Sequence, residues 1–502
     1  MTANGNHNFP KPVLLLVLDG IKPEVLRAAI GAGETPILAA LANRGEALWD
    51  AVSVFPSITP AATAAIVTGK APAKSGIVGH AWYDDTEKRI VVYGAMTETV
   101  ISTGPIKVFH NNVWRMNRDD LHAATLFEDL HDSGIDGACV NFPIRRGPHT
   151  HQVRMKTVGG YLKGGRYLGP SVDGPKEYYM GDLFYSRKTA FSGRKGRGGI
   201  RRSVGINDEY AARIGAMLVK EKAAPFNLVY FFKGDSVAHH KGLAAQRQYL
   251  ATADEYVGRI FNAGGGVEQV LSDYAVLALS DHGHDPLLPN RRYVRLYRIP
   301  GEKVSLGAKA SFANGTTVVA VPNGRSALLY LRESATPEVL SNYLLARRGV
   351  DLASWLDGDW GVVRRVGTEV RFRPGDGPRD PFGRSWELEG DPRALNLKVS
   401  ENTVRYGQYP DALERLWGFL HSSRGGDLVL SATPGYTFGE VSGGYHTASD
   451  HGSLHASDSN VFMLASGIRA PRRITDVAPT LLEHFRGGDR APEVSNVEPH
   501  VV

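Results

Sequence analysis

The sequence predicts an α/β fold whose core is a doubly wound, mostly parallel sheet with helices on both faces, together with a smaller α+β insertion. An uninterrupted apolar run at 13–18 and mainly apolar runs at 226–232 and 274–280 are typical of strands buried on both faces. Helix-like segments lie between these runs, which favours strand–helix–strand units and a parallel sheet. The pattern of apolar and polar residues changes between 300 and 400, where short alternating runs indicate a separate α+β region.

The first apolar run ends at Asp19-Gly20. Segments 23–31 and 34–45 then have the pattern of helices, and 47–54 that of the next strand. In open α/β sheets, ligands bind at the carboxyl ends of the strands. The acid and glycine after the first run therefore indicate the edge of the sheet that carries the site.

Residues 53–69 predict a strand end, a turn and a helix. Thr59 stands where an N-cap belongs, Pro60 follows at the first helical position, and Gly69 is a natural stop. A hydroxyl at a helix N-terminus faces unpaired N–H groups and the positive end of the helix dipole. The segment therefore suits phosphate binding and an ionised hydroxyl, although alone it predicts no more than a helix cap.

Further along, the sequence predicts strands and helices in alternation. Strands are expected at 135–142, 226–232 and 274–280, and helices at 123–133, 208–222 and 244–263. Residues 145–205 interrupt this order and are rich in Arg, Lys, Gly and Tyr, most densely at 187–202. Two interpretations stay open for this segment: a positive lid over an anionic ligand, or a solvated surface loop.

Residues 300–400 predict a smaller unit. Alternating runs at 316–321 and 326–331 precede a helix at 337–347 and a loop-rich stretch. The alternation of helices and strands resumes with a helix at 412–420 and a strand at 426–431, and a final strand and helix follow. We therefore expect residues 10–299 and 401–490 to form the core and residues 300–400 an insertion or cap.

Composition narrows the class of protein. The 502 residues can form a large core, and the net charge of +6 suits anionic substrates as well as nucleic acid. Cys139 is the only cysteine, which excludes an internal disulfide and a cysteine-built metal site. The polar N-terminus has neither a signal sequence nor a membrane span, so we expect a cytoplasmic protein without membrane contact.

Three acids come directly after predicted strands, and histidines accompany two of them. Asp235 is followed by His239, and Asp281 by His282, while Asp19 stands without a neighbouring histidine. Carboxylates and neutral imidazoles bind Zn²⁺, Mn²⁺ and similar ions. Two such ions about 4 Å apart are the usual clamp for phosphoryl transfer, and a bound cation can activate a threonine hydroxyl.

These pieces together resemble the type I phosphodiesterase/nucleotide pyrophosphatase branch of the alkaline phosphatase superfamily. The resemblance depends on Asp19-Gly20, on Phe-Pro-Ser-Ile-Thr59 with Ile-Val-Thr-Gly69 ten residues on, and on three further motifs. Those three motifs are Asp235-Ser-Val-Ala-His239-His-Lys-Gly242, Ser280-Asp281-His282-Gly283 and Asp450-His451-Gly452-Ser453. The pieces span residues 13 to about 486 but leave 300–400 without a motif, and they imply an alkaline-phosphatase-like core.

The resemblance implies two divalent metal ions, usually zinc, with manganese or magnesium as alternatives. One ion would be held by Asp235, His239 and His451. The other would be held by Asp19, Thr59, Asp281 and His282. The implied mechanism is attack by Thr59 on phosphorus through a covalent phospho-threonine intermediate.

One position departs from the family pattern. Family diesterases often carry an asparagine after the Gly-Ile-Val element, where this chain has His80. His80 could contact a phosphate oxygen or be a surface histidine, and both interpretations stay open. We expect His284 and His455 to support the ligands, with His455 as the substitute if His451 is misplaced.

Several functions remain after this comparison of motifs. A sulfatase needs Cys or Ser at the nucleophile position, and cofactor-independent phosphoglycerate mutase uses serine, so Thr59 disfavours both. We expect a phosphodiesterase or nucleotide pyrophosphatase acting on a small phosphorylated substrate such as a nucleotide. The alternatives are a phosphomonoesterase, a phosphonate hydrolase, or a non-catalytic anion- or nucleic-acid-binding protein. The sequence does not determine the substrate or the oligomeric state.

Overall fold

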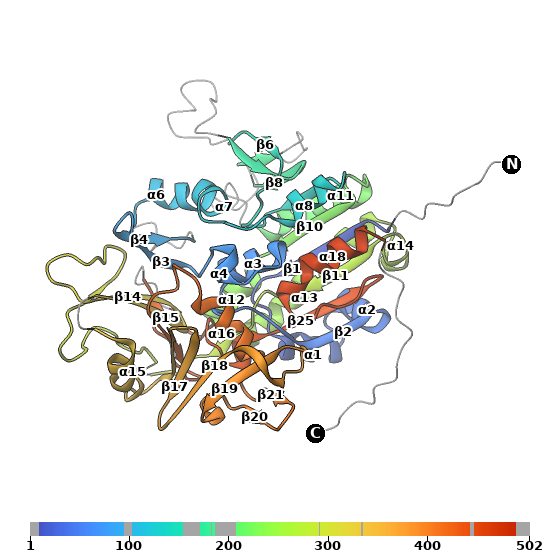
Figure 1. The fold of residues 1–502 in the computed structure, drawn as a ribbon. Coiled ribbons are helices and arrows are strands. Elements are labelled where there is room, and N and C mark those ends of the chain that lie inside the picture. The colour runs from blue at the N-terminus through green and yellow to red at the C-terminus, as the bar shows by residue number, and fades with distance from the viewer. Residues whose placement is uncertain are drawn as a thin grey trace, which may run out of the picture.

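Two β-sheets organise the chain and lie side by side in the computed structural model (Figure 1). The structure describes residues 10–94, 103–153, 171–181, 183–185, 207–290, 292–332, 335–441 and 446–487. The basic segment 187–202 lies outside these ranges, so the two interpretations of it stay open.

The first sheet has eight strands within the described residues. Their order is β2 (Glu46–Val52), β25 (Asn460–Ser466), β11 (Ala275–Leu279), β1 (Val13–Leu18), β10 (Phe226–Phe231), β5 (Gly137–Val140), β8 (Glu177–Met180) and β9 (Phe184–Tyr185). The run from β11 to β8 is parallel, whereas β25 is antiparallel to both of its neighbours and β9 to β8. The predicted mostly parallel sheet is confirmed.

Helices cover both faces of this sheet, as its buried strands require. Alternate residues of β1 enter two hydrophobic cores: Val13, Leu15 and Val17 the first, and Leu14, Leu16 and Leu18 the second. The first core contains α3 (Thr59–Thr68), α8 (Leu126–Asp132), α16 (Ala412–Leu420) and α18 (Val477–Phe485). The second contains α1 (Pro23–Gly31), α2 (Pro36–Arg44), α11 (Asp208–Lys220), α13 (Leu243–Ala263) and α14 (Val267–Asp273). The fold is therefore doubly wound, as predicted.

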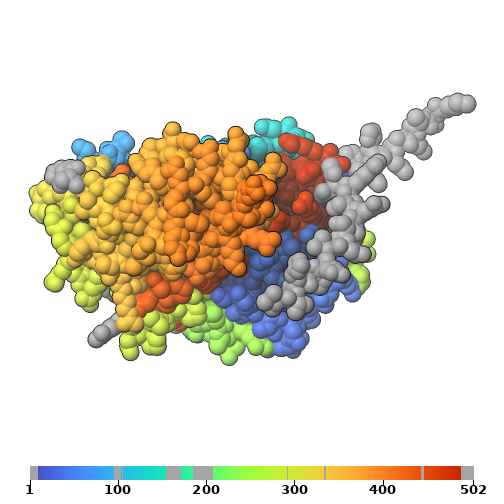
Figure 2. Space-filling model, turned by 60° about the horizontal axis from the view of Figure 1, so that its bottom comes forward, coloured from blue at the N-terminus to red at the C-terminus, as the bar shows by residue number. Residues whose placement is uncertain are grey.

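The second sheet is mainly antiparallel and forms the smaller region. Its order is β13 (Val304–Leu306), β14 (Val318–Gly324), β15 (Ser326–Leu331), β22 (Leu428–Ala432), β16 (Val350–Asp357), β17 (Trp360–Arg365), β18 (Thr368–Arg379) and β19 (Ser385–Gly390), with β23 (Gly439–Glu440) paired to β14. Helix α15 (Pro337–Leu345) packs against β16. Figure 2 shows the yellow and orange residues of this region as one continuous area beside the blue N-terminal helices.

Strand β22 shows that the second sheet reaches beyond residue 400. It lies between β15 and β16, and the sequence had assigned its residues to the closing part of the core. A short apolar strand carries no signal of which sheet it will join, because both sheets bury such runs. The division of the chain at residues 300 and 400 stays a prediction.

Short elements complete the described chain. The ribbons are β3 (Ala81–Asp84) with β4 (Arg89–Val92), β6 (His149–His151) with β7 (Val172–Gly174), β12 (Asp285–Pro286) with β24 (Ser449–Asp450), and β20 (Lys398–Val399) with β21 (Val404–Arg405). The short helices are α4 (Pro72–Ser75), α6 (Pro105–His110), η1 (Asn111–Arg115), α7 (Met116–Arg118), α12 (Lys233–Lys241), α17 (Ala456–Ser459), η2 (Pro392–Leu395) and η3 (Ile474–Asp476).

The start of α3 differs from the prediction by one residue. Ile58 is the N-cap, Thr59 is the first helical residue, and the Thr59 side chain makes no capping hydrogen bond. The reason is that its hydroxyl faces a histidine rather than the backbone of its own helix. Gly69 ends the helix at φ 66°, in the left-handed region that glycine adopts without strain, as predicted.

Within the described ranges, no single helix has both the length and the apolar character needed to cross a membrane. Helices α1 and α2 meet those criteria only as a pair, and that pair is bent by 100°.

Candidate metal and phosphate site

Two acids meet because their strands are parallel neighbours. Asp19 follows β1 and Asp281 follows β11, and the two strands pair in register up to Val17 and Leu279. Gly20 links the two ends, since its N–H donates to Asp281 Oδ1 at 3.0 Å. Gly20 has φ 63°, and a Cβ there would lie 2.7 Å from His284 Nε2, so the position requires glycine.

A short helix places the third acid beside them. α12 begins after β10 and carries Asp235 and His239 one turn apart, on the same side of the helix. The carbonyl of His239 accepts hydrogen bonds from the N–H groups of Thr447 and Ala448, at 3.2 and 3.0 Å, which fixes α12 to the loop leading to His451. The sequence did not predict this helix, although the Asp-x-x-x-His spacing is compatible with one.

Three donor atoms form a tight triangle around the end of α12. Asp235 Oδ1 lies 3.1 Å from His239 Nε2 and 3.4 Å from His451 Nε2, and the two Nε2 atoms are 3.1 Å apart. Zinc–nitrogen and zinc–oxygen bonds of about 2.0–2.1 Å at tetrahedral angles separate their donors by about 3.3–3.4 Å. The triangle therefore has the size of one face of a tetrahedral metal site.

The tautomers of both histidines follow from their other ring nitrogens. His239 Nδ1 donates to the carbonyl of Ser449 at 3.0 Å, and His451 Nδ1 donates to the carbonyl of Ser57 at 2.8 Å. Each neutral ring then has a lone pair on Nε2. Two lone pairs and a carboxylate oxygen point at one another, an arrangement that repels unless a cation or a proton lies between them.

A second donor group surrounds His282. Its Nε2 lies 3.4 Å from Asp19 Oδ1, 3.8 Å from Asp281 Oδ2 and 3.1 Å from Thr59 Oγ1, while its Nδ1 donates to the carbonyl of Gly283 at 3.0 Å. Asp19 Oδ1 and Asp281 Oδ2 are buried and have no hydrogen-bond partner among the described residues. The unpartnered oxygens are thus the same atoms that face the lone pair of His282, which fits a cation held between them.

The two donor groups are neighbours. The rings of His282 and His451 stack with centroids 3.7 Å apart, and His282 Nε2 lies 4.0 Å from Asp235 Oδ1. All seven residues that the sequence singled out as ligands are therefore brought together by the fold. The Thr59 hydroxyl lies beside the second donor group, 3.1 Å from His282 Nε2.

The carboxyl groups differ in protonation when no cation is bound. Burial, with repulsion from Asp235, raises the pKa of Asp19 well above its usual range. Burial and the neighbouring Asp19 raise the pKa of Asp281 to about 7. Burial opposes ionisation of Asp235 too, but without a cation the protonated form of His239 and hydrogen bonds from the surrounding imidazoles, His284 among them, hold its pKa well below its usual range. Such opposed shifts are typical of functional sites.

Further side chains position the ligands. His284 Nε2 lies 3.0 Å from Asp235 Oδ1, and the Ser449 hydroxyl lies 3.2 Å from its Nδ1, so His284 can donate to the carboxylate. His446 stacks on His239 with centroids 3.6 Å apart, and its Nδ1 lies 3.0 Å from Asp450 Oδ1. His284 therefore has the supporting contact expected from the sequence, and His446 is an addition that the sequence did not reveal.

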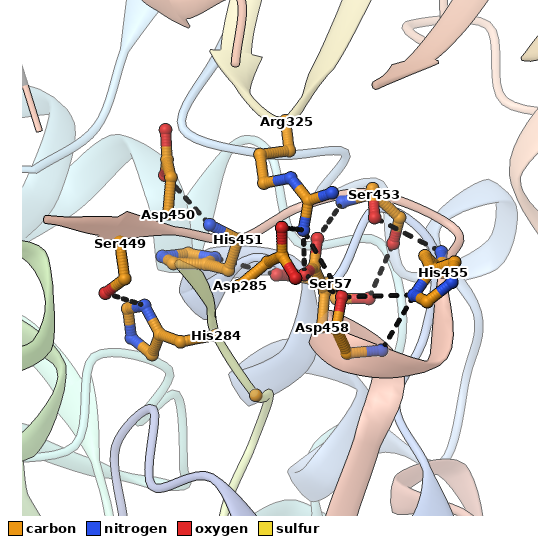
Figure 3. A network of polar contacts seen from close by, with 12 residues as sticks. Ser57, His284, Asp285, Arg325, Ser449, Asp450, His451, Ser453, His455 and Asp458 are labelled. Atoms are coloured by element: carbon orange, nitrogen blue, oxygen red, sulfur yellow. Dashed lines mark hydrogen bonds and ion pairs between the residues drawn. The ribbon is translucent and has the colours of Figure 1, made fainter. Parts of the chain in front are cut away.

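A buried ion-pair network holds the loop of His451 (Figure 3). The Arg325 guanidinium is inaccessible to solvent and pairs with Asp458 and, at 3.2 Å, with Asp285. The N–H of Arg325 also donates to the carbonyl of His451 at 2.8 Å. His455 lies in this network, where its Nδ1 accepts from the N–H of Ser457 at 3.1 Å. His451 itself lies beside Asp235 and His239, whereas the contacts of the His455 ring within the described residues are with Ser457 and Tyr409.

Two more groups near the donors were not identified from the sequence. The Tyr230 hydroxyl donates to Asp19 Oδ2 and so orients the carboxylate whose other oxygen is unpartnered. Burial raises the pKa of Glu440 to about 8, and the charges of Asp450 and Asp235 contribute to this shift. Tyr230 lies inside an ordinary apolar strand, so its pattern carries no functional signal.

His80 lies close enough to the first donor group to interact electrostatically with it. Burial lowers the pKa of His80 to about 3, and the charges of His451, His446 and His239 contribute to the shift. The ring is therefore neutral at pH 7 and has one N–H to donate. It is partly shielded from solvent rather than freely exposed.

Comparison with known proteins adds two findings. The family model of type I phosphodiesterase/nucleotide pyrophosphatase matches residues 13–454. Among solved structures, phosphonoacetate hydrolase from Sinorhizobium meliloti 1021 in complex with phosphonoformate is similar at a TM-score of 0.55 and 17% identity, covering 96% of this chain and 97% of that one. Murine ectonucleotide pyrophosphatase/phosphodiesterase 5 is similar at a TM-score of 0.55 and 13% identity, covering 97% and 98%.

Proposed function

The chain belongs to the type I phosphodiesterase/nucleotide pyrophosphatase family of phosphoric ester hydrolases, and from this premise we propose that it cleaves phosphodiesters or pyrophosphates with Thr59 as the nucleophile. The observation that carries the proposal is the 3.1 Å contact between Thr59 Oγ1 and His282 Nε2, inside a cluster of buried carboxylates and imidazoles. A threonine that served only as a helix cap would hydrogen-bond to its own helix, and Thr59 does not.

We propose two divalent cations as cofactors, with zinc as the preferred ion and manganese or magnesium as alternatives. Asp235, His239 and His451 would hold one, and Asp19, Thr59, Asp281 and His282 the other. Cations bound there would favour the ionised form of the Thr59 hydroxyl and neutralise charge on the phosphate. The donor set supports this assignment because it contains nitrogen and oxygen atoms only, with edges of tetrahedral size and two unpartnered carboxylate oxygens.

The chemistry of Thr59 follows from its place on α3. As the first helical residue, it lies among N–H groups that have no partner within the helix, and the positive end of the dipole favours a phosphate there. Thr59 Oγ1 would form a bond to phosphorus while the bond to the leaving oxygen breaks, and the leaving group takes up a proton. Water would then attack the same phosphorus, and Thr59 Oγ1 departs with its hydroxyl restored.

We assign His80 to a hydrogen bond with a phosphate oxygen that does not bridge to the leaving group. Support comes from its neutral ring, which has one N–H donor at pH 7, and from the influence of His451 and His239 on its pKa. An amide and a neutral imidazole both donate one N–H here, so His80 can take the place of the asparagine that family diesterases often carry. His80 is then a binding group and not an acid or base.

The substrate class is proposed from the chemistry of the site together with the ligands of two structurally similar proteins. Murine ectonucleotide pyrophosphatase/phosphodiesterase 5 is described in complex with AMP, and the bacterial phosphonoacetate hydrolase with phosphonoformate. Both ligands are small and anionic, and the site described here suits a small phosphorylated compound. We propose a nucleotide-containing diester as the first substrate to test, with monoesters and phosphonates as the alternatives.

A substrate panel tests this proposal on purified metal-loaded protein. It compares bis-p-nitrophenyl phosphate, p-nitrophenyl phosphate, a thymidine p-nitrophenyl ester and a phosphonate monoester. We expect kcat/KM for the diesters to exceed that for the monoester at least tenfold. Preference for the monoester or the phosphonate would identify one of the alternatives, and no hydrolysis of any compound would favour a non-catalytic anion-binding protein. The cytoplasmic location stays a prediction, which cell fractionation would test.

A further inference from the structure

A cavity of about 490 Å³ lies outside the two donor groups. Four arginines, four tyrosines and one valine line it, so the lining contains no acidic side chain. Its walls are the segment 293–298, the end of α15 with residues 347–348, and Tyr436. We call it the Arg–Tyr cavity. Its volume falls within the range of about 300–1,000 Å³ that is typical of small-ligand sites.

One arginine of the Arg–Tyr cavity is structural. The guanidinium of Arg347 donates to the carbonyls of Arg295 and Arg298, and so fixes the segment that carries both of them. The wall is therefore held in place by the protein itself. A fixed wall reduces the conformational entropy that is lost when a ligand binds.

The other three arginines carry charge without a counter-ion. Arg295 donates to the Tyr297 hydroxyl at 2.9 Å, and Arg348 lies over the ring of Tyr436 at 5.7 Å. Arg298 lies over Tyr297 at 5.7 Å. None of these three guanidinium groups is within ion-pair distance of a carboxylate in the described part of the chain. Three like charges around one cavity attract an anion, and guanidinium groups match the geometry of phosphate oxygens.

The tyrosines add flat aromatic surface. Tyr297 and Tyr343 are 45% and 41% exposed, and guanidinium groups lie near both rings, Arg298 over Tyr297 at 5.7 Å and Arg347 over Tyr343 at 5.2 Å. Exposed tyrosine rings beside arginines are the combination that holds nucleobases by stacking while the arginines hold phosphates. Sulfate or phosphate alone would use the arginines and leave both rings exposed to water.

We propose that the Arg–Tyr cavity binds a nucleotide, with its phosphate on Arg295, Arg298 and Arg348 and its base on Tyr297 or Tyr343. A volume of about 490 Å³ is sufficient for a single nucleotide, whereas a nucleic-acid strand would require a continuous groove. This site goes beyond the proposed function and does not depend on hydrolysis at Thr59.

The cavity is in contact with the loop of the metal site. The Tyr293 hydroxyl donates to the carbonyl of His446 at 2.8 Å, and Arg292 Nη1 donates to the carbonyl of Thr447 at 2.9 Å. Both acceptors come shortly before Asp450 and His451 in the chain. The cavity is thus a separate site that shares a wall with the catalytic loop, and the two can be examined independently.

Photoaffinity labelling locates the nucleotide directly. Metal-loaded full-length protein is labelled with 8-azido-AMP, and the labelled peptides are identified by mass spectrometry. We expect label on peptides that contain Tyr297 or Tyr343, and at least tenfold less of it in Arg298→Glu/Arg348→Glu. AMP should compete at least tenfold better than adenosine or inorganic phosphate, because only AMP uses both the rings and the arginines.

A matched variant separates this effect from net charge. Arg27→Glu/Arg405→Glu changes two exposed arginines elsewhere and alters the net charge equally, so its labelling should equal that of the wild type. Hydrolysis of bis-p-nitrophenyl phosphate should stay within twofold in both double variants, whatever the substrate panel shows. The proposal is overturned by label confined to the peptides of the metal ligands, by equal labelling of Arg298→Glu/Arg348→Glu, or by competition from a single-stranded oligonucleotide but not from AMP.

Discussion

The Nε2 atoms of His239 and His451 lie 3.1 Å apart, and each ring donates its Nδ1 proton to a backbone carbonyl. Neither nitrogen can donate to the other while both rings are neutral. Asp235 Oδ1 completes the group at 3.1 and 3.4 Å. Three electron pairs held this close by buried backbone contacts are stable only around positive charge, which is the physical basis for assigning a cation to them.

Metal content should respond separately to changes in the two donor groups. Asp235→Asn weakens the first group and Asp19→Asn the second, so each variant is expected to lose about one of two metal equivalents per chain. Inductively coupled plasma mass spectrometry on dialysed protein measures this loss. His455→Ala is the matched control and should keep both equivalents, because its ring contacts Ser457 rather than the donors. Full metal content in Asp235→Asn would exclude the assignment of the first group.

Tyr230→Phe should loosen the second cation without disturbing the fold. The change removes only the hydroxyl that donates to Asp19 Oδ2, and the ring stays packed in the sheet. Loss of such an outer hydrogen bond typically lowers metal affinity by about 10–100-fold. Chelator competition gives the affinity, and thermal unfolding of the metal-free form is the control. An unchanged affinity would show that Asp19 needs no orienting partner.

His80 can be tested by comparing two substitutions. His80→Ala removes the proposed hydrogen bond to phosphate and should lower kcat/KM for bis-p-nitrophenyl phosphate by about 10–100-fold, equivalent to about 1.4–2.7 kcal/mol. His80→Asn supplies an N–H again and should recover most of that loss. Metal content should be equal in all three proteins. Equal kcat/KM in His80→Ala and wild type would exclude the proposed hydrogen bond from His80 to the phosphate.

Asp208 predicts a pH dependence of stability at a residue outside the candidate ligand set. Burial raises its pKa to about 6, although the hydroxyl of Tyr249 and the N–H groups of Phe232 and Lys233 donate to it. The folded state therefore holds the proton more tightly than the unfolded chain, whose aspartates titrate near about 3.9. The resulting stabilisation is complete below about pH 4 and is lost as the pH rises through about 6.

Asp208→Asn isolates this contribution because asparagine does not titrate. Between pH 4 and 7 the free energy of unfolding of wild type should fall relative to the variant by about 2–3 kcal/mol, from a shift of about two pKa units. Urea denaturation of both metal-free proteins across this range measures the difference. Parallel pH profiles would show that Asp208 has an ordinary pKa in the folded protein.

The central sheet was predictable from the sequence because it depends on local patterns, whereas the candidate ligand set followed from the resemblance of short motifs to a known family and stays a prediction. Apolar runs ending in Asp19 and Asp281 specify buried strands with acids at their carboxyl ends, and parallel pairing then brings those ends together. His451 was placed by its Asp-His-Gly motif, although about 170 residues separate it from Asp281 in the chain. Parallel pairing does not explain His451, which follows β24 outside the central sheet, yet the structure places its Nε2 3.1 Å from that of His239.

Other features could not be predicted because they depend on long-range packing. Strand β22 joins the second sheet, and β25 runs antiparallel to β11, yet both are ordinary apolar strands in sequence. Arg325 and Tyr230 touch the site only through the folded chain, from segments with no motif. Thr59 was predicted to be the N-cap of α3 but is its first helical residue. The sequence pattern is the same whether the Thr59 hydroxyl faces His282, as it does here, or the backbone of its own helix.

Turnover by Thr59→Ala in metal-loaded protein tests the central claim most directly. If the Thr59 hydroxyl attacks phosphorus, its removal should lower kcat for bis-p-nitrophenyl phosphate by at least about 10³-fold, as is usual for loss of a catalytic nucleophile. Thr59→Ser should retain part of the activity, since it keeps a hydroxyl at the start of α3. Wild-type turnover by Thr59→Ala at full metal content would contradict the claim.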